Sequence, residues 1–295
     1  MSIQGLRRWC GQSVVRGPAG MALAAAVLSG CGLPVGPLGI KASETWTHTY
    51  PLSKAGEVTI VNANGRIEVE GGEGATVEVQ ATKIASGATE QLAKDLLPRI
   101  PIEEHATADF VSVETRRLNG FMIGASYEVR YKVKMPRGAT IRATTTNGGV
   151  SINGMEGRVI ARTTNGGIMA TQIAGGIEAR SVNGGVRVQF ASTGTQPAEL
   201  RTVNGGIHVA LPATAKATVK ATWVNGGINL TGLPFEIQEQ AKRRFEGRLN
   251  GGGPSVEMAT VNGGITIGSE LDKSRRGTGW DEPPPGLPPD LHERR

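Results

Sequence analysis

Paired carboxylates are the first chemistry to look for in this sequence, because glycoside hydrolysis usually needs two of them held about 5–10 Å apart. From Thr140 to Gly268 the sequence contains no Asp, and its acidic residues are Glu at positions 156, 178, 199, 236, 239, 246 and 257. Their spacing does not single out a pair. We therefore expect no catalytic residue, and a polysaccharide-active enzyme is kept as the main alternative to a binding protein.

Histidine and cysteine are too sparse for a metal site. His208 is the only histidine of this region, and Cys10 and Cys31 both lie far before it. Zinc sites need three or four such ligands, and calcium-binding glycine-rich repeats need Asp. We expect no metal and no cofactor, and we interpret His208 as a solvated strand residue.

Arginine offers a binding chemistry instead. Arg162, Arg180 and Arg201 occupy equivalent places in successive repeats, so stacked repeats would align them in one column. Stacked strands lie about 4.8 Å apart, and three unpaired cations at that spacing would attract an anionic glycan or phosphate. Glu178 and Glu199, each two residues before an arginine of the column, could neutralise it. The column is thus a candidate anion-binding site, with an ordinary solvated face as the alternative.

Cys31 is the residue with the most specific chemistry. Arg7, Arg8 and Arg16 precede an apolar run of about ten residues, which is typical of a secretory signal and too short to span a bilayer. The run ends in Leu28-Ser29-Gly30-Cys31, which resembles the lipobox of bacterial lipoproteins. That resemblance implies cleavage before Cys31 and attachment to a membrane through acyl chains on Cys31. An ordinary cleaved signal is the alternative.

The charge balance argues against nucleic acid as a partner. The chain carries a net charge of +6, and loss of residues 1–30, with three Arg and no acidic residue, leaves +3. So small an excess does not favour a polyanionic nucleic acid.

A turn repeat fills the middle of the chain. Asn-Gly-Gly occurs at 147, 165, 183, 204, 225, 250 and 262, with a lone Asn-Gly at 64. Asn and Gly both tolerate the positive φ of tight turns. We interpret Asn147, Asn165, Asn183, Asn204, Asn225 and Asn262 as structural turns whose side chains bond to one another in a ladder, in preference to a binding row.

The residues between the turns alternate apolar and polar with a period of two, as in a strand with one buried face. Two arrangements fit: an antiparallel meander of hairpins, or a solenoid of stacked coils. Midway between the Asn-Gly-Gly turns at 147, 165 and 183 lie less regular glycine turns, at 156–158 and 174–176. Because the two kinds of turn alternate, the sequence repeats every eighteen residues from 147 to 183. We therefore predict an all-β fold, a single-stranded β-solenoid with Asn-Gly-Gly turns. One coil alone could not offset its ordering entropy, so stability must come from stacking.

The flanking regions complete the expected organisation. The pattern predicts irregular strands over 46–135, a short helix from Thr89 to Leu97 ended by Pro98, and a second short helix over 234–241 followed by the basic cluster Lys242, Arg243 and Arg244. That cluster could contact acidic lipid, with a solvated loop as the alternative. The expected parts are a signal peptide (1–30), a lipidated tether (31–43), the solenoid (44–268) and a disordered Pro-rich tail (269–295).

From about Glu44 to Ile267 the chain resembles the bacterial putative adhesin family, a β-repeat domain of unknown function found in envelope proteins. The motifs that carry the resemblance are the segments 61–67 and 131–136, the repeated Thr-x-Asn-Gly-Gly-Ile units and the segment 209–212. The resemblance implies a β-solenoid and an envelope location, and it transfers no catalytic residue.

The sequence therefore predicts a non-enzymatic, lipid-anchored surface or interaction module of the cell envelope. The expected partners are the membrane, through the acyl chains, and an envelope or extracellular glycan or protein. Gly32 is not the Asp that retains some lipoproteins at the inner membrane, which favours the outer membrane. Besides the polysaccharide-active enzyme, a structural or sensory protein facing the periplasm remains an alternative.

Overall fold

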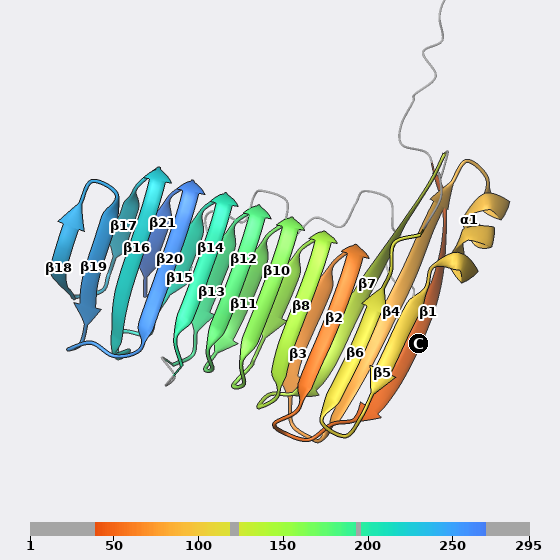
Figure 1. Ribbon diagram of the computed structural model, residues 1–295, viewed down its shortest axis with the longest axis horizontal. Coiled ribbons are helices and arrows are strands. Elements are labelled where there is room, and N and C mark those ends of the chain that lie inside the picture. The colour runs from red at the N-terminus through yellow and green to blue at the C-terminus, as the bar shows by residue number, and fades with distance from the viewer. Residues whose placement is uncertain (1–38, 119–123, 193–195, 270–295) are drawn as a thin grey trace, which may run out of the picture. The chain divides into compact units, whose positions relative to one another are not determined.

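The computed structural model of the chain describes residues 39–118, 124–192 and 196–269. The described residues form two β-sheets and one short α-helix (Figure 1). The predicted signal segment, Cys31, residues 31–38 of the predicted tether and the predicted tail from residue 270 onward lie outside the described residues.

The strands are divided between a ten-stranded and an eleven-stranded sheet. The ten-stranded sheet has the order β1 (Ile40–Pro51), β4 (Thr76–Gly87), β7 (Ala125–Pro136), β3 (Ile67–Gly72), β9 (Val150–Asn153), β11 (Ile168–Ile173), β13 (Val186–Phe190), β15 (Ile207–Ala210), β21 (Ile265–Gly268) and β17 (Ile228–Thr231). The eleven-stranded sheet has the order β18 (Phe235–Ala241), β19 (Arg244–Leu249), β16 (Ala217–Asn225), β20 (Ser255–Asn262), β14 (Ala198–Asn204), β12 (Ile177–Asn183), β10 (Val159–Asn165), β8 (Thr140–Asn147), β2 (Glu57–Asn64), β6 (Phe110–Thr115) and β5 (Ile102–Ala106).

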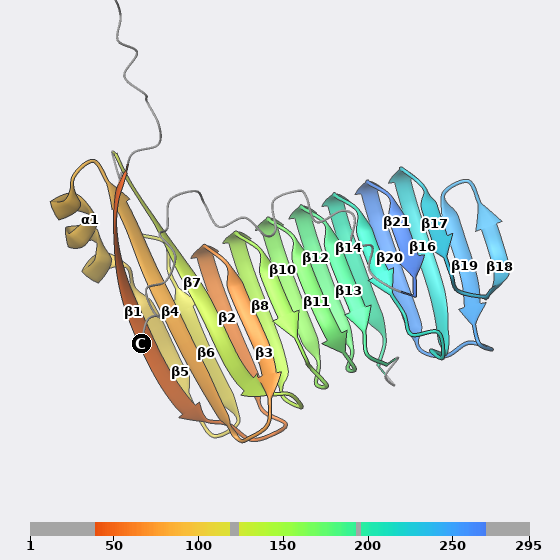
Figure 2. The same cartoon turned by 180° about the vertical axis from the view of Figure 1, so that it is seen from behind.

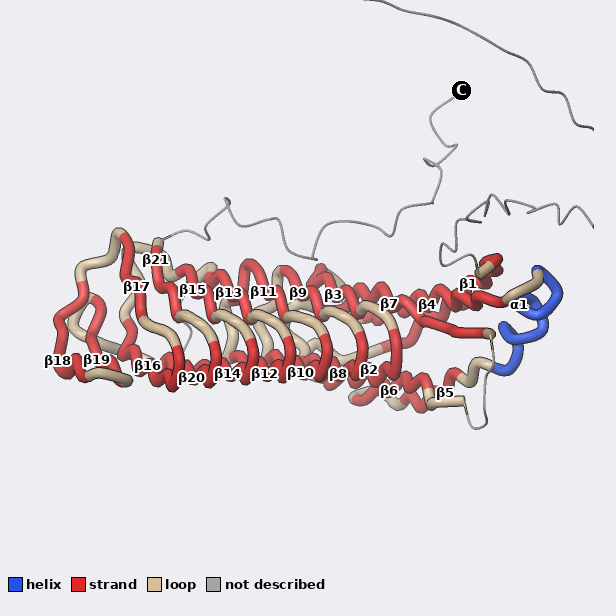
Figure 3. The backbone as a smooth tube through the Cα atoms, turned by 90° about the horizontal axis from the view of Figure 1, so that it is seen from above, coloured by secondary structure: helices blue, strands red, loops and turns tan. Residues whose placement is uncertain are grey.

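Strands that follow one another in the repeats lie in different sheets. β10 pairs with β8 and β12, and β11 pairs with β9 and β13, in both cases in parallel. Figure 3 shows the two sheets as two rows, with the turns passing from one row to the other. The described repeats are therefore not a meander of hairpins. They form long, mostly parallel arrays, consistent with a solenoid.

The alternating pattern buries one side of each strand between the sheets. In β11, Ile168 and Ala170 are fully buried, while Met169 between them is only partly covered. Neighbouring strands repeat the pattern in register, so Ile168 lies beside Val150 and Val186. The result is one continuous core of Val, Ile and Ala, in which each fully buried aliphatic side chain contributes about 1.5–3 kcal/mol.

The Asn-Gly-Gly turns leave no room for a side chain at their first glycine. Gly166 has φ +153°, and a Cβ there would lie 2.0 Å from the carbonyl oxygen of Gly148 on the next coil. Beside the turn, the buried hydroxyl of Thr163 donates a 2.8 Å hydrogen bond to that same oxygen. Ser181 and Thr202 make the equivalent bonds on the following coils, so the polar groups of the bend are satisfied where the backbones come closest.

The N-terminal end contains the predicted short helix. α1 (Glu90–Leu96) begins after Thr89, whose side chain accepts a hydrogen bond from the backbone N–H of Leu92. A short 3₁₀ turn, Leu97–Arg99, contains Pro98 and follows it directly. Leu96 is buried, whereas Leu92, one turn before it, is 40% exposed.

The second predicted helix, over 234–241, is wrong. Those residues form β18, which pairs antiparallel with β19 as a hairpin. Phe235 and Ile237 alternate with polar residues, and this period of two is typical of a strand. Phe235 also packs edge-on against Phe245 at 5.8 Å. The edge of β16, with which β19 pairs, stabilises the hairpin, whereas an isolated helix of this length is only marginally stable.

The spatial order of the coils departs from their chain order at both ends. β7 lies between β3 and β4, although it comes after both in the sequence. Similarly, β20 and β21 lie between the coil of β14 and β15 and the coil of β16 and β17 (Figure 2). The last described coil is therefore an insertion into the stack and not its end.

Candidate binding faces

A continuous ladder of Asn side chains runs along the turns. Nδ2 of each Asn donates to Oδ1 of the Asn on the preceding coil of the stack, at 2.7–2.9 Å. In spatial order the members are Asn64, Asn147, Asn165, Asn183, Asn204, Asn262 and Asn225. Asn250 is not a member, because its amide donates to the carbonyl oxygens of Ala213 and Ala215. The ladder occupies one donor and the acceptor of its interior side chains, which gives these residues a structural role.

The arginine column, defined as Arg162, Arg180 and Arg201, lies on the outer face of the eleven-stranded sheet, in strict register. Its members are not unpaired cations. Glu178 accepts from Arg162 at 2.7 Å and lies 3.1 Å from Arg180, and Glu199 bridges Arg180 and Arg201. Glu178 and Glu199 therefore partly neutralise the column, and anion binding by the column stays a prediction.

Glu178 is the best-covered acid of this face. Its side chain is 15% exposed. The hydrogen bond from Arg162 holds the pKa of its carboxyl below the usual range, and the charges of Arg180 and Arg158 act in the same direction. Four arginines thus surround two carboxylates, Glu178 and Glu199, which leaves a local excess of positive charge. These six residues are Arg158, Arg162, Glu178, Arg180, Glu199 and Arg201.

Next to the column runs a stripe of exposed valines. The valine stripe consists of Val182, Val203, Val261 and Val224, on the adjacent strands β12, β14, β20 and β16, and each side chain is 39–46% exposed. A hollow of about 450 Å³, the valine hollow, lies between this stripe and the column. It forms where the arginine row gives way to shorter side chains, Ala259 beside Arg201 and then Thr222 beside Ala259.

The sequence contains a signal for the valine stripe. The residue before Asn is Thr at 146 and 164 but Val at 182, 203, 224 and 261. An exposed position that changes from polar to apolar over four neighbouring strands marks an apolar surface patch.

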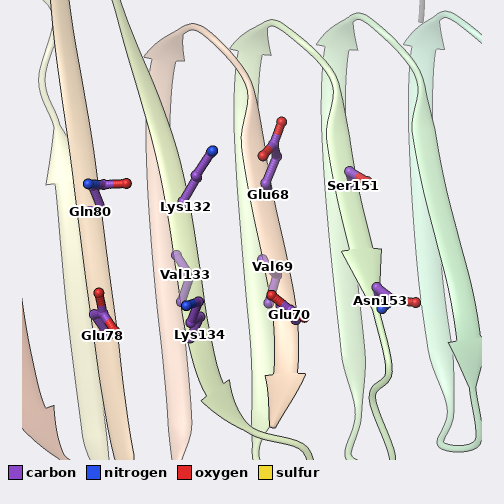
Figure 4. Close-up of a pocket in the computed structure, with 10 residues that line it drawn as sticks. All are labelled: Glu68, Val69, Glu70, Glu78, Gln80, Lys132, Val133, Lys134, Ser151 and Asn153. Atoms are coloured by element: carbon purple, nitrogen blue, oxygen red, sulfur yellow. The ribbon is translucent and has the colours of Figure 1, made fainter. Parts of the chain in front are cut away.

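A second hollow lies on the outer face of the ten-stranded sheet (Figure 4). The lysine hollow, also about 450 Å³, contains two rows of alternating charge. Lys134 of β7 lies between Glu78 of β4 and Glu70 of β3, and Lys132 lies between Gln80 and Glu68. The sequence could not reveal this hollow, because it depends on the insertion of β7 between β3 and β4.

An aromatic cluster lies at the N-terminal end. The ring of Trp46 stacks on that of His48 at 4.3 Å, and Nδ1 of His48 lies 2.8 Å from a carboxylate oxygen of Glu104. The Tyr50 hydroxyl donates to the same oxygen. Burial, and then the bond to Glu104, raise the pKa of Tyr50 far above its usual value. These contacts connect β1 and β5, the edge strands of the two sheets.

His208 and the predicted basic cluster do not line the valine hollow or the lysine hollow. His208 lies partly buried on β15, between Ile207 and Val209. Lys242 and Arg243 form the turn between β18 and β19, and Arg244 begins β19. Arg244 pairs with Glu239 at 3.3 Å and Glu246 at 3.5 Å. The predicted basic cluster is therefore a hairpin turn with one ion-paired arginine.

The described residues lack two further features. Within residues 39–118, 124–192 and 196–269, no three His, Cys, Asp or Glu side chains are grouped so as to hold a metal ion. In the same ranges, no helix has the length and apolar character needed to cross a bilayer.

Comparison with solved structures finds distant relatives. A putative cell adhesion protein from Clostridium sporogenes has 11% identity and a TM-score of 0.44, over 76% of this chain and 99% of that one. A putative lipid binding protein from Parabacteroides distasonis has 12% identity and a TM-score of 0.27, over 76% and 96%. A putative adhesin from Bacteroides fragilis has 8% identity and a TM-score of 0.29, also over 76% and 96%. Similarity at this level assigns no function.

The family of this chain is identified by its sequence profile and not by the solved structures. No curated protein matches the sequence. The profile of the Toastrack DUF4097 family matches residues 49–268, which include the strand repeats, the ladder and both hollows. This match confirms the predicted resemblance to a β-repeat family of unknown, adhesin-like function. The chain therefore belongs to the Toastrack DUF4097 family.

Proposed function

We propose that this protein is a non-enzymatic interaction module of the cell envelope, adhesin-like in its mode of binding. In this proposal the fold is a single-stranded β-solenoid with Asn-Gly-Gly turns. Acyl chains on Cys31 hold it on a membrane, and the outer faces of the sheets contact an envelope or extracellular glycan or protein.

The observation that carries the proposal is the unbroken register of the outer face. From β8 to β14 each strand aligns with the next without a shift, so equivalent side chains recur at about 4.8 Å along the stack. Such a face is rigid and periodic. It suits a repetitive partner, which meets the same contact many times and gains affinity through multivalency.

The open shape of the two hollows supports binding without turnover. Sites for small substrates are usually concave and bury most of the ligand, whereas both hollows here lie on outer sheet faces. A partner that extends over the surface fits this shape better than an enclosed substrate does.

The alternative, a polysaccharide-active enzyme, has one observation in its favour. Glu70 and Glu78 lie on the two strands that flank β7. Twice the spacing between strands places them about 10 Å apart, which is near the separation of the two carboxylates in an inverting glycosidase. However, Lys134 lies between them (Figure 4) and occupies the place of a scissile bond. Conversion of an acidic polysaccharide by the wild type, lost in Glu70→Gln and Glu78→Gln, would favour the enzyme.

The test of the module is protease shaving of intact cells against lysed cells. One epitope is placed in the tail after residue 270 and one in the hairpin turn at Lys242 and Arg243, which is exposed. Loss of both epitopes from intact cells is expected for a surface module. Protection until lysis would contradict the adhesin-like role and favour a structural or sensory role in the periplasm.

A further inference from the structure

The valine hollow combines features that call for a specific occupant. It lies beside four exposed valines and is bordered by Arg180 and Arg201. Below it on the face, toward the start of β20, Glu257 accepts a hydrogen bond from Ser255 and forms no ion pair among the described residues. An occupant should therefore present an apolar group to the hollow and a basic group to Glu257.

The sequence after Ser269 contains both groups, the basic group before the apolar one. It reads Lys273-Ser274-Arg275-Arg276, then Gly277-Thr278-Gly279, then Trp280-Asp281-Glu282, and then three prolines. Trp280 is the one aromatic residue of this tail. We infer that the tail of this same chain docks on the valine hollow, with the Trp280 side chain in the hollow and Arg276 beside Glu257.

The tail starts at a suitable place. The carbonyl oxygen of Gly268 accepts from the N–H of Leu211, which begins the connection from β15 to β16. Ser269 thus lies at the edge where the chain passes from the ten-stranded to the eleven-stranded sheet, the edge at which β20 also begins. The tail has to turn this edge and then follow β20 toward Val261.

The length of the tail is sufficient. Crossing from one sheet to the other covers about 10 Å, and the six steps from Ser255 to Val261 cover about 20 Å. Trp280 follows Ser269 by eleven residue steps, which span about 36–40 Å in an extended chain.

The spacing of the charges along the tail agrees with the face. Trp280 follows Arg276 by four residues, and Val261 follows Glu257 by four residues. Two extended segments that run side by side in the same direction would therefore place both pairs together. The small residues between Arg276 and Trp280 add little bulk where the tail passes close to the strand.

This docking goes beyond the proposed function and does not depend on the membrane anchor. A docked tail would occupy the most apolar part of the periodic face, so an external partner would have to displace it. The tail would then act as a built-in competitor for that surface.

The test uses tryptophan fluorescence of the full chain. Emission from Trp280 is isolated as the difference between the wild type and Trp280→Phe, and its exposure is measured by acrylamide quenching. In the wild type we expect blue-shifted emission and a quenching constant several-fold lower than in 6 M urea. The double variant Val203→Thr/Val261→Thr should raise that constant toward the urea value.

The matched control is Thr146→Val/Thr164→Val. It makes the reverse change on the same row, at positions that do not line the hollow, and should leave the Trp280 signal unchanged. Threonine already occupies this row, so the main variant is expected to fold, which circular dichroism will check.

Two results would overturn the inference. The first is a Trp280 quenching constant in the folded wild type equal to that in urea. The second is protection of Trp280 that falls on dilution of the protein, because the occupant would then be the tail of a second copy. Slower trypsin cleavage after Arg275 and Arg276 in the wild type than in the Val→Thr variant would support docking independently.

Discussion

Nδ2 of Asn183 donates a 2.9 Å hydrogen bond to Oδ1 of Asn165 on the neighbouring coil. Asn183 in turn accepts one, also of 2.9 Å, from Asn204. Each interior Asn of the ladder therefore joins two neighbours, whereas Asn225 at its end makes one ladder bond.

Asn183→Ala is expected to lower the free energy of unfolding by about 1–3 kcal/mol, because it removes two bonds worth about 0.5–1.5 kcal/mol each. Asn225→Ala, the control, removes one and should cost about half as much. Urea unfolding followed by circular dichroism measures both. Equal losses for the two variants would contradict a role for the ladder in stability.

Gly166→Ala is expected to cost about 3 kcal/mol or more, or to prevent folding, because the added Cβ would meet the carbonyl oxygen of Gly148 at a strained φ. Gly227→Ala provides the control, since a Cβ there meets nothing within 4 Å. Thermal unfolding compares the two. A similar melting temperature for both would show that the close approach at the turn is not what requires glycine.

Acid should remove the contribution of Glu178 to stability. Arg162 lowers the pKa of this carboxyl in the folded chain. The contribution is therefore present above the unfolded pKa, about 4.3, and is lost as the pH falls through the lowered folded pKa. Glu178→Gln should melt below the wild type at pH 7, and the difference should shrink as the pH falls below about 4.3. Glu257→Gln serves as the control, and a pH-independent difference for Glu178→Gln would argue against the pairing.

The arginine column should bind polyanions through its excess of positive charge. We expect Arg162→Ala/Arg180→Ala/Arg201→Ala to elute from heparin-agarose at lower salt than the wild type. Lys242→Ala/Arg243→Ala/Arg244→Ala removes the same charge from the hairpin turn and should shift elution less. Unchanged retention of the column variant would dismiss the column as a binding site.

The anchor is tested by Cys31→Ser, which should move the protein from the membrane pellet to the soluble fraction, because the acyl chains would have no attachment point. Cys10→Ser, within the predicted signal, should leave the protein in the pellet. Membrane pelleting of the Cys31→Ser protein would refute the anchor.

Local patterns predicted much of this fold, because they depend on residues close together in the sequence. The period of two around Ile168 and Ala170 identifies strands and their buried side, and Thr89 and Pro98 delimit α1. The column of Arg162, Arg180 and Arg201 follows from their common position, three residues before the Asn of each turn.

The pairing of strands far apart in the sequence could not be predicted in this way. Every coil presents similar edges with the same apolar spacing, so the pattern does not state which edge a strand will join. That is why the insertion of β7, the hairpin of β18 and β19, and the lysine hollow were missed. The same limit hid the valine hollow, which requires Ala259 of β20 to lie beside Arg201 of β14.

The position of β20 and β21 has a consequence for how the molecule is completed. A chain that ended before Ser255 would lack the strands that join β14 to β16 and β15 to β17. It would expose four unpaired strand edges in the middle of the stack, and such edges promote aggregation. Residues of β20 and β21 thus close a gap between strands that precede them in the sequence. A chain terminated before Ser255 would therefore expose these strand edges to proteases, whereas a chain that includes β20 and β21 pairs them.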